Sequence, residues 1–288
     1  MAHVFTLANA KGGCGKSTVA LNLSICFARS GLRTLAIDLD QQGNLSAALG
    51  VDLNSLKFTA HRFLIDEETD LTQFLIEPRP RLKLMPNTID IDADDLLEAR
   101  KVNRELLLKK RLKPVLHDFD IVIIDTPPAM RAATLNGLAM ADTLIIPVDS
   151  SYFALLGLNQ LLQVVAAVRE AHQPDMVIRA LTTMFTRRQN LDKQIRKRIE
   201  AFFGEELVLE TIIHKSVSIG EAAALQKGIV EYSTATSGTF DFSKLAQELL
   251  AERTYETQSA RQSECESRKS HPSGFQKSGC HLPDPGRD

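Results

Sequence analysis

Two lysines and a run of glycines near the start of the chain have the types and spacing needed to hold phosphate. The segment reads Ala10-Lys11-Gly12-Gly13-Cys14-Gly15-Lys16-Ser17-Thr18. Glycines let a backbone approach phosphate closely, and successive N–H groups at a helix N-terminus form an anion cradle. In such a loop Lys16 would reach the β- and γ-phosphates, and the Ser17 hydroxyl would bind Mg²⁺. An apolar run before the loop predicts a strand and the segment after it predicts a helix, which is the context that this loop requires.

Cys14 occupies the variable position of the loop. Its small side chain suits it to fill space beneath the glycines. A helix N-terminus also lowers the pKa of a thiol, so a redox switch is a second interpretation of the same residue.

Three aspartates at the ends of predicted strands supply carboxylates for the same site. Asp125 ends the apolar run 121–125, and a buried carboxylate there needs a cation, for which Mg²⁺ held through water is the obvious choice. Asp38 and Asp40 lie two residues apart at the end of the run 34–39. On its own an Asp-x-Asp at a strand end is equally a turn signal, and the neighbouring loop makes it a candidate site.

The elements that must position these residues alternate along the chain. Predicted strands cover residues 4–9, 34–39, 81–85, 121–125, 144–148, 177–184 and 207–213. Predicted helices cover residues 17–30, 93–112, 155–171, 191–203 and about 240–252. Short runs of Val, Ile and Leu without alternation are typical of strands buried on both faces of a parallel sheet. The order predicts an α/β fold, a doubly wound, mostly parallel sheet with helices on both faces.

Composition excludes several classes of protein. The 288 residues are 44% apolar and 24% charged with a mean hydropathy of −0.09, unlike a disordered, collagen-like or coiled-coil chain. With 34 basic and 36 acidic residues the net charge is −2, so nucleic-acid binding requires a local patch. The four cysteines form no Cys-x-x-Cys pair, and we find neither a signal-peptide pattern nor a membrane-spanning run. We expect a soluble, cytoplasmic protein.

Residues 11–18 resemble the deviant Walker A motif of the ParA/MinD family of ATPases, in which a second lysine precedes the glycines. Other segments agree in order and spacing. They are Asp38-Leu-Asp40-Gln-Gln-Gly-Asn44, Asp120-Ile-Val-Ile-Ile-Asp125-Thr-Pro-Pro128, and residues 147–157, 184–191 and 218–222. The likeness covers roughly residues 2–252 and is nearest to the chromosomal ParA (Soj) type. It implies a P-loop NTPase domain of the deviant Walker A type over residues 1–252.

The resemblance implies a slow, partner-stimulated ATPase with ATP and Mg²⁺ as cofactors, and a homodimer in the ATP state with two nucleotides at the interface. Lys11 would then cross to the partner's phosphates and offset the negative charge that develops during hydrolysis. A lysine beside the phosphate cradle is otherwise expected to have little to do within its own subunit. By resemblance Asp40 positions the attacking water and Asp38 supports the Mg²⁺ shell. The implied catalytic residues are Lys11, Lys16 and Asp40, and the implied metal residues are Ser17, Asp38 and Asp125. The implied ATP-binding residues are Lys11, Gly12, Gly13, Cys14, Gly15, Lys16, Ser17, Thr18, Met184 and His214.

The sequence departs from the family pattern outside the phosphate chemistry. Gln41 replaces the usual proline, and His214 replaces a proline that often packs near the adenine. Ser218 stands where Soj-type proteins carry a DNA-contacting arginine, and Gly220 and Ala223 replace Ser and Pro in the same loop. These changes affect the adenine pocket and one DNA contact.

A basic cluster near residues 187–198 is the best candidate for DNA binding. The candidate residues are Arg187, Arg188, Lys193, Arg196 and Lys197, and Arg188 aligns with a family arginine that contacts DNA. On a predicted helix Leu191, Ile195, Ile199 and Phe202 share one face and the basic residues lie opposite. A solvated helix face is the alternative. We expect the ATP-bound dimer to bind duplex DNA regardless of sequence, to associate with the nucleoid, and to act with a ParB-like or cargo-adaptor protein.

Two other functions are compatible with the fold. A MinD-like membrane-patterning ATPase needs a C-terminal amphipathic helix, and the tail after Leu250 has no apolar stripe, so we expect no stable membrane association. A metabolic enzyme of the same superfamily could be a redox protein, which would need bridging cysteines, or an amide-forming ligase, which would not need the Arg188 cluster. Residues 253–288 are rich in Ser, Arg, Glu, Gln, Gly and Pro and predict a disordered tail, or one docked as extended chain.

Overall fold

The computed structural model describes residues 2–151, 157–186 and 190–270. Within these ranges one sheet has the strand order β3-β4-β2-β5-β1-β6-β7-β8, and only β3 and β4 pair antiparallel. The strands are β1 (His3–Leu7), β2 (Thr34–Asp38), β3 (Ile76–Arg79), β4 (Leu82–Met85), β5 (Ile121–Asp125), β6 (Thr143–Asp149), β7 (Val177–Phe185) and β8 (Val208–His214). The predicted α/β fold with a mostly parallel sheet is confirmed.

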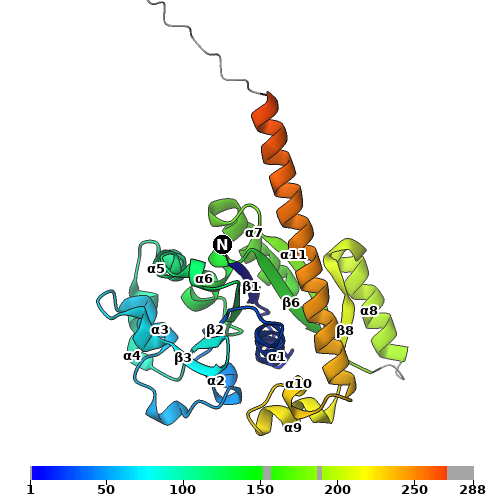
Figure 1. Ribbon diagram of the computed structural model, residues 1–288, viewed down its shortest axis with the longest axis horizontal. Helices are drawn as coiled ribbons and strands as arrows, with labels where there is room; N and C mark the ends of the chain where they lie inside the picture. Colours follow the sequence, from blue (N-terminus) through cyan, green and yellow to red (C-terminus); the bar gives the residue numbers. More distant parts are fainter. Residues whose placement is uncertain (1, 152–156, 187–189, 271–288) are drawn as a thin grey trace, which may run out of the picture. The chain divides into compact units, whose positions relative to one another are not determined.

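Helices connect the strands and are visible in Figure 1. They are α1 (Lys16–Arg29), α2 (Asn44–Ala48), α3 (Ala60–Ile65), α4 (Ile91–Ala99), α5 (Leu107–Leu112), α6 (Ala132–Met140), α7 (Leu158–His172), α8 (Asn190–Phe203), α9 (Val217–Ala224), α10 (Ile229–Tyr232) and α11 (Ser237–Ser270). None of the helices in the described ranges is long and apolar enough to cross a lipid bilayer.

The two faces of the central strand β1 show why the sheet is covered on both sides. Phe5 stacks on Phe27 of α1, with ring centroids 5.8 Å apart. The next side chain, Thr6, points to the opposite face and donates a hydrogen bond to Gly137 O of α6 at 2.8 Å. Successive strand residues alternate between faces, so α1 and α6 cover opposite sides of the sheet. Gly137 permits the close approach of α6, because a Cβ there would lie 2.9 Å from Thr126 Cγ2.

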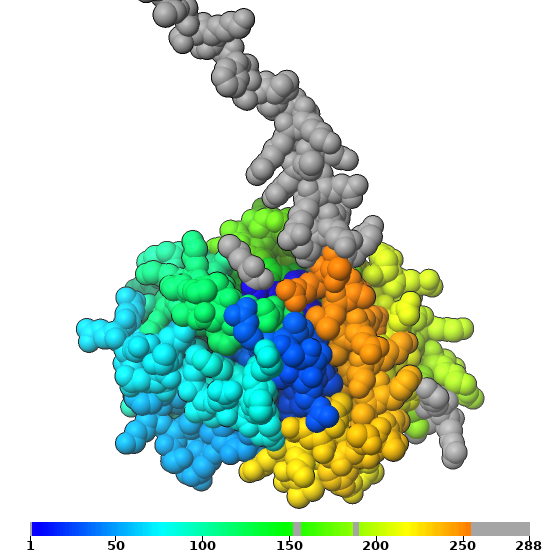
Figure 2. Space-filling model, viewed as in Figure 1, coloured from blue at the N-terminus to red at the C-terminus, as the bar shows by residue number. Residues whose placement is uncertain are grey.

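Helix α1 packs near α10, at the side of the sheet where the phosphate-binding loop lies. The α10 segment is tied to α1 by a hydrogen bond of 2.7 Å from Ile229 N to Asn22 Oδ1. Figure 2 shows α1 in blue between the cyan segment and the yellow segment that contains α9 and α10. The loop before α1 follows β1, and β2, β5 and β6 run in the same direction as β1, so the loop lies at the edge of the sheet where these strands end. Ligands bind at this edge in open parallel sheets.

The structure differs from the predicted elements at two places within residues 76–112. The helix predicted over residues 93–112 is two helices, α4 and α5, because Arg100 is extended and Asn103 has a positive φ of 52°. Asn tolerates this left-handed conformation, and it reverses the chain direction between the helices. Strand β3 was not predicted, since it is short and contains Pro78, which is compatible with an edge strand.

The predicted end of the last helix is wrong. We expected the helix to end near residue 252 and disorder from Arg253, but the backbone is helical to Ser270. Residues 253–270 contain no Gly or Pro and are rich in Glu, Arg and Gln, which are good helix formers, whereas Pro272 follows. The rest of the predicted tail lies outside the described residues. The chain divides into two compact units, residues 1–248 and 249–288.

Candidate nucleotide-binding site

The predicted phosphate-binding loop joins the end of β1 to the start of α1. Gly13 and Gly15 have φ angles of 74° and 97°, in the region that glycine alone enters at low cost. A hydrogen bond of 2.9 Å from Val19 N to Gly15 O closes the first turn of the helix. The N–H groups before it have no acceptor within the helix, and with the positive end of the helix dipole they suit an anion.

Lys16 lies across the inside of this loop. Its side chain is buried, and Nζ donates hydrogen bonds to Asn9 O at 3.2 Å and Lys11 O at 3.3 Å. Both acceptors are neutral carbonyl groups, so the ammonium charge is available to a phosphate at the centre of the loop.

Cys14 anchors the loop from below. The thiol is buried and donates to Lys11 O at 3.3 Å, while Thr183 of β7 donates to Cys14 O at 2.8 Å. Burial raises the pKa of this thiol, although Lys16 offsets part of the effect. A protonated, enclosed thiol is a poor nucleophile, so the geometry favours the space-filling interpretation over the redox switch.

Two carboxylates end adjacent strands beside the loop. Pairing of β2 with β5 places Asp38 opposite Asp125, and neither is accessible to solvent. Asp38 accepts three hydrogen bonds, from Ser46 N (2.9 Å), Ser46 Oγ (2.7 Å) and Asp40 N (3.1 Å). Within the described ranges the oxygens of Asp125 have no hydrogen-bond partner.

The electrostatics of this carboxylate pair favour a cation. Burial raises the pKa of Asp38 to about 7, against the opposing effect of its hydrogen bonds with Ser46. Burial raises the pKa of Asp125 well above its ordinary value, and the charge of Asp38 raises it further. Since Asp38 is the better solvated by hydrogen bonds, a proton shared by the pair resides on Asp125. A divalent cation would replace that proton.

The residues present fit Mg²⁺, with Asp125 and Ser17 as the groups that would hold it and Asp38 in a supporting position. Asp125 offers a buried carboxylate whose oxygens have no hydrogen-bond partner among the described residues, and the Ser17 hydroxyl and Lys16 lie close enough to lower its pKa in part. Both oxygens of Asp38 already accept hydrogen bonds, so Asp38 shapes the site instead of offering a free ligand. In the described ranges no three His, Cys, Asp or Glu side chains form a cluster able to hold a metal. Mg²⁺ takes few protein ligands and completes its shell with water and phosphate, as this site requires.

One cavity of about 560 Å³ brings together most of the predicted residues. It is lined by the loop and α1 residues Gly12, Gly13, Gly15, Lys16, Ser17 and Thr18, and also by Asp40 and Met184. Asp40 is mostly buried, and its Oδ1 accepts a hydrogen bond of 3.0 Å from Gln42 N. The cavity therefore presents a carboxylate opposite the anion-binding loop.

The structure corrects the expectation that Lys11 has little to do within its own subunit. Its Nζ forms an ion pair with Asp149 at 2.7 Å and donates to Ser151 Oγ at 2.7 Å. Lys11 thus has partners within its own subunit, because the end of β6 presents a carboxylate to it. Any role of Lys11 in a partner subunit requires this ion pair to break.

His214 lies in a different cavity from Met184. This second cavity, of about 880 Å³, is lined by Phe185, Thr186, His214, Phe240 and Asp241, among others. The backbone N and Nδ1 of His214 both bond with Asp241 Oδ2 at 2.9 Å, and Phe185 packs edge-on against the imidazole at 5.8 Å. Sequence reasoning missed Phe185 and Asp241. The position of Phe185 directly after Met184 was the available signal, and Asp241 offered none.

The basic helix α8 differs from its predicted orientation. Arg187 and Arg188 lie outside the described residues. Lys193 and Lys197 are exposed, as expected of a DNA-binding face. Arg196 turns inward, where it bonds with Glu200 (2.6 Å), Thr182 Oγ1 (2.9 Å) and Leu209 O (3.0 Å). All three sides of its guanidinium are occupied, so Arg196 is not part of the candidate DNA surface.

The buried face of α8 agrees with the predicted one at Ile195 and Ile199 and differs by one residue at each end. It consists of Asp192, Ile195, Ile199 and Phe203, whereas Leu191 is 50% exposed. Asp192 accepts a hydrogen bond from Thr186 N. This contact explains why a charged residue is buried at a position that the periodicity alone assigned to the solvent side.

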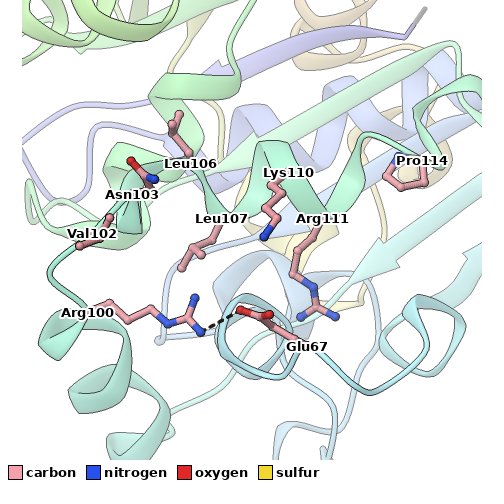
Figure 3. Close-up of a pocket in the computed structure, with 9 residues that line it drawn as sticks. All are labelled: Glu67, Arg100, Val102, Asn103, Leu106, Leu107, Lys110, Arg111 and Pro114. Atoms are coloured by element: carbon pink, nitrogen blue, oxygen red, sulfur yellow. Dashed lines mark hydrogen bonds and ion pairs between the residues drawn. The ribbon is translucent and has the colours of Figure 1, made fainter.

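A further cavity, of about 590 Å³, contains none of the predicted residues. Figure 3 shows Arg100, Lys110 and Arg111 around it, with Arg100 paired to Glu67 at 3.0 Å. Its apolar lining comes from Val102, Leu106 and Leu107. The chemistry of the phosphate site does not involve this cavity.

Comparison with known proteins agrees with the site. Residues 2–178 match the family described as "AAA domain". The chain is 32% identical over 255 residues to the chromosome partitioning protein ParA of Myxococcus xanthus, which covers 88% of this chain and 89% of that protein. It is 32% identical over 252 residues to the sporulation initiation inhibitor protein Soj of Bacillus subtilis, covering 87% and 99%. The structure of cobyrinic acid a,c-diamide synthase from Mycobacterium smegmatis with bound ADP and magnesium superposes with a TM-score of 0.77, at 29% identity, covering 88% and 96%.

The doubly wound sheet, the phosphate-binding loop and the carboxylates beside it define a P-loop NTPase. The second lysine of the loop and the identity to ParA and Soj over most of the chain narrow the class. The chain belongs to the ParA/MinD family and is an ATPase.

Proposed function

We propose that this protein is a partitioning or positioning ATPase, which dimerises with ATP, binds DNA without regard to sequence and moves a cargo together with a ParB-like or adaptor partner. Similarity to ParA and Soj over nearly the whole length of both supports this proposal. The observation that carries it is the loop with two lysines, of which Lys16 lies inside the phosphate cradle and Lys11 is held outside it.

The described residues divide the chemistry of ATP hydrolysis. Loop N–H groups and Lys16 hold the β- and γ-phosphates, and Ser17 and Asp125 would hold Mg²⁺, which screens phosphate charge when bound. Asp40 faces the same cavity and orients the attacking water. The aromatic cavity at Phe185 and His214 is the place for adenine, since a planar base suits an apolar pocket with a few fixed polar groups.

Dimerisation would make Lys11 an ATP-dependent switch. In the free subunit Lys11 neutralises the carboxylate of Asp149. The phosphates of ATP bound to a partner subunit would offer Lys11 a more strongly charged anion. Asp40→Ala should trap the ATP-bound dimer, and Lys11→Ala should abolish turnover. Size-exclusion chromatography with light scattering, in ATP and in ADP, measures the first effect. A strictly monomeric Asp40→Ala protein with ATP contradicts the proposal.

DNA binding would follow from doubling the exposed cations of α8 about a two-fold axis. An electrophoretic mobility shift with any duplex in ATP but not in ADP, weakening steeply with salt, is the expected result. Equal binding in both nucleotide states would contradict the switch. The cargo and the stimulating partner are to be sought among proteins that accelerate hydrolysis only when DNA is present.

An amide-forming ligase is the second candidate, favoured by the structural similarity to cobyrinic acid a,c-diamide synthase at 29% identity. A ligase consumes ATP in proportion to a carboxylic acid and an amine donor. ATP turnover by the purified chain without either compound, accelerated by DNA, distinguishes the partitioning ATPase from the ligase.

A further inference from the structure

A buried histidine contacts the backbone of the candidate catalytic segment from outside the nucleotide cavity. His61 lies on α3 and is 2% exposed. Its Nε2 lies 3.0 Å from Leu39 O, the carbonyl directly before Asp40. Its Nδ1 forms a hydrogen bond with Asp94 Oδ1 of α4. The ring therefore joins two helices to the strand end that carries the carboxylates.

The peptide group between Leu39 and Asp40 is held at both of its polar atoms. Its carbonyl accepts from His61, and its N–H, on Asp40, donates to Asp38 Oδ1 at 3.1 Å. The neighbouring N–H of Leu39 donates to Asp125 O at 2.9 Å. The orientation of this peptide plane fixes the direction in which the Asp40 side chain leaves the backbone.

The two partners of His61 hold the ring through both of its nitrogens. A carbonyl oxygen only accepts hydrogen bonds, so Nε2 is the donor to Leu39 O. An ion pair between Arg62 of α3 and Asp90, the residue directly before α4, lies beside this contact.

We propose that His61 is a positioning residue for ATP hydrolysis, which holds the Leu39–Asp40 peptide so that Asp40 faces the γ-phosphate, with Asp94 keeping the ring in place. The inference rests on the proposed role of Asp40. It assigns a function in hydrolysis to a histidine that does not line the nucleotide cavity.

The test compares steady-state hydrolysis of Mg-ATP by variants of the full chain. His61→Ala removes the donor to Leu39 O, and we expect kcat to fall on the order of tenfold with KM for ATP unchanged, since misplaced groups slow the chemical step. His61→Gln keeps an N–H donor near the position of Nε2 and should recover most of kcat. Asp94→Ala should lower kcat by a smaller factor, because the ring stays but loses its support.

The matched control is Phe63→Leu on the same helix, a buried core residue that packs against Phe74 and has no polar group to donate to Leu39 O. It should lower the melting temperature while leaving kcat intact. If kcat of the His61 variants and of Phe63→Leu falls in proportion to their melting temperatures, His61 is only structural and the proposal is wrong. His61→Gln and Asp94→Ala give the same decision if His61→Ala does not fold.

The same measurements distinguish the proposed role of Asp40 from the positioning role of His61. Normal hydrolysis by Asp40→Ala overturns the proposed role of Asp40, whatever the His61 variants do. Loss of hydrolysis in Asp40→Ala together with normal kcat in His61→Ala overturns only the positioning role of His61.

Discussion

Asp125→Asn tests whether Asp125 is a buried carboxyl group whose ionised form is disfavoured until a cation binds. The carboxylate is inaccessible, and its pKa is raised well above its ordinary value by burial and by Asp38. In the unfolded chain the pKa of this carboxyl group is close to its ordinary value of 3.8. Above that pH the folded protein binds more protons at this site than the unfolded chain, so the wild type loses stability as pH rises towards the folded pKa. Asparagine has the same shape and does not titrate.

The expected difference follows from this linkage. Each pH unit between the unfolded and folded pKa changes the relative free energy of unfolding by up to about 1.4 kcal/mol. From pH 4.5 to pH 6.5 the stability of Asp125→Asn relative to the wild type should rise by up to about 3 kcal/mol. At about 2–4 °C per kcal/mol for a unit of this size, the relative melting temperature should rise by about 6–12 °C.

Thermal melting at both pH values, with and without Mg-ATP, measures the effect. Without ligand the variant should gain on the wild type as pH rises. With Mg-ATP at about 100 times its Kd the wild type should gain about 2.7 kcal/mol, and the variant should lose most of that gain. Asp118→Asn is the control, since Asp118 is an exposed carboxylate with 61% of its side chain accessible. A pH-independent difference, or an undiminished response of Asp125→Asn to Mg-ATP, would refute the reasoning.

The remaining predictions concern α8 and α6. Lys193→Glu combined with Lys197→Glu should abolish the ATP-dependent mobility shift and leave the melting temperature within about 1 °C, because both side chains are exposed; an unchanged shift would show that DNA binds elsewhere. Arg196→Met should instead lower the free energy of unfolding by about 2–3 kcal/mol in urea titration, since it leaves Thr182 and Leu209 without their donor; loss of DNA binding at full stability would return Arg196 to the DNA surface. Gly137→Ala should cost about 1–3 kcal/mol, because its Cβ would lie 2.9 Å from Thr126 Cγ2, and an unchanged urea midpoint would contradict that packing argument.

Local patterns in the sequence were sufficient to predict the fold and the phosphate-binding loop. The glycines of the loop and the apolar strand runs depend on residues that are near one another in the chain, and the strand ends differ from prediction by only one or two residues. The prediction of one helix over residues 93–112 was wrong, because helix periodicity does not reveal a single positive φ angle such as that of Asn103. The predicted end of the last helix was wrong because a composition typical of disorder also contains good helix formers.

The sequence by itself predicted which groups form the site, namely two lysines, a serine hydroxyl and three carboxylates, because a glycine-rich loop between a strand and a helix gives meaning to the carboxylates at the neighbouring strand ends. The tertiary structure decided their partners. It paired Lys11 with Asp149, turned Arg196 away from solvent, buried Asp125 opposite Asp38 and placed His61 Nε2 next to Leu39 O. The contacts of Lys11 with Asp149, His61 with Leu39 and Arg196 with Thr182 span 138, 22 and 14 positions of the chain, and the burial of Asp125 depends on the whole sheet. Such contacts follow from how the elements pack, and no local pattern in the chain encodes them.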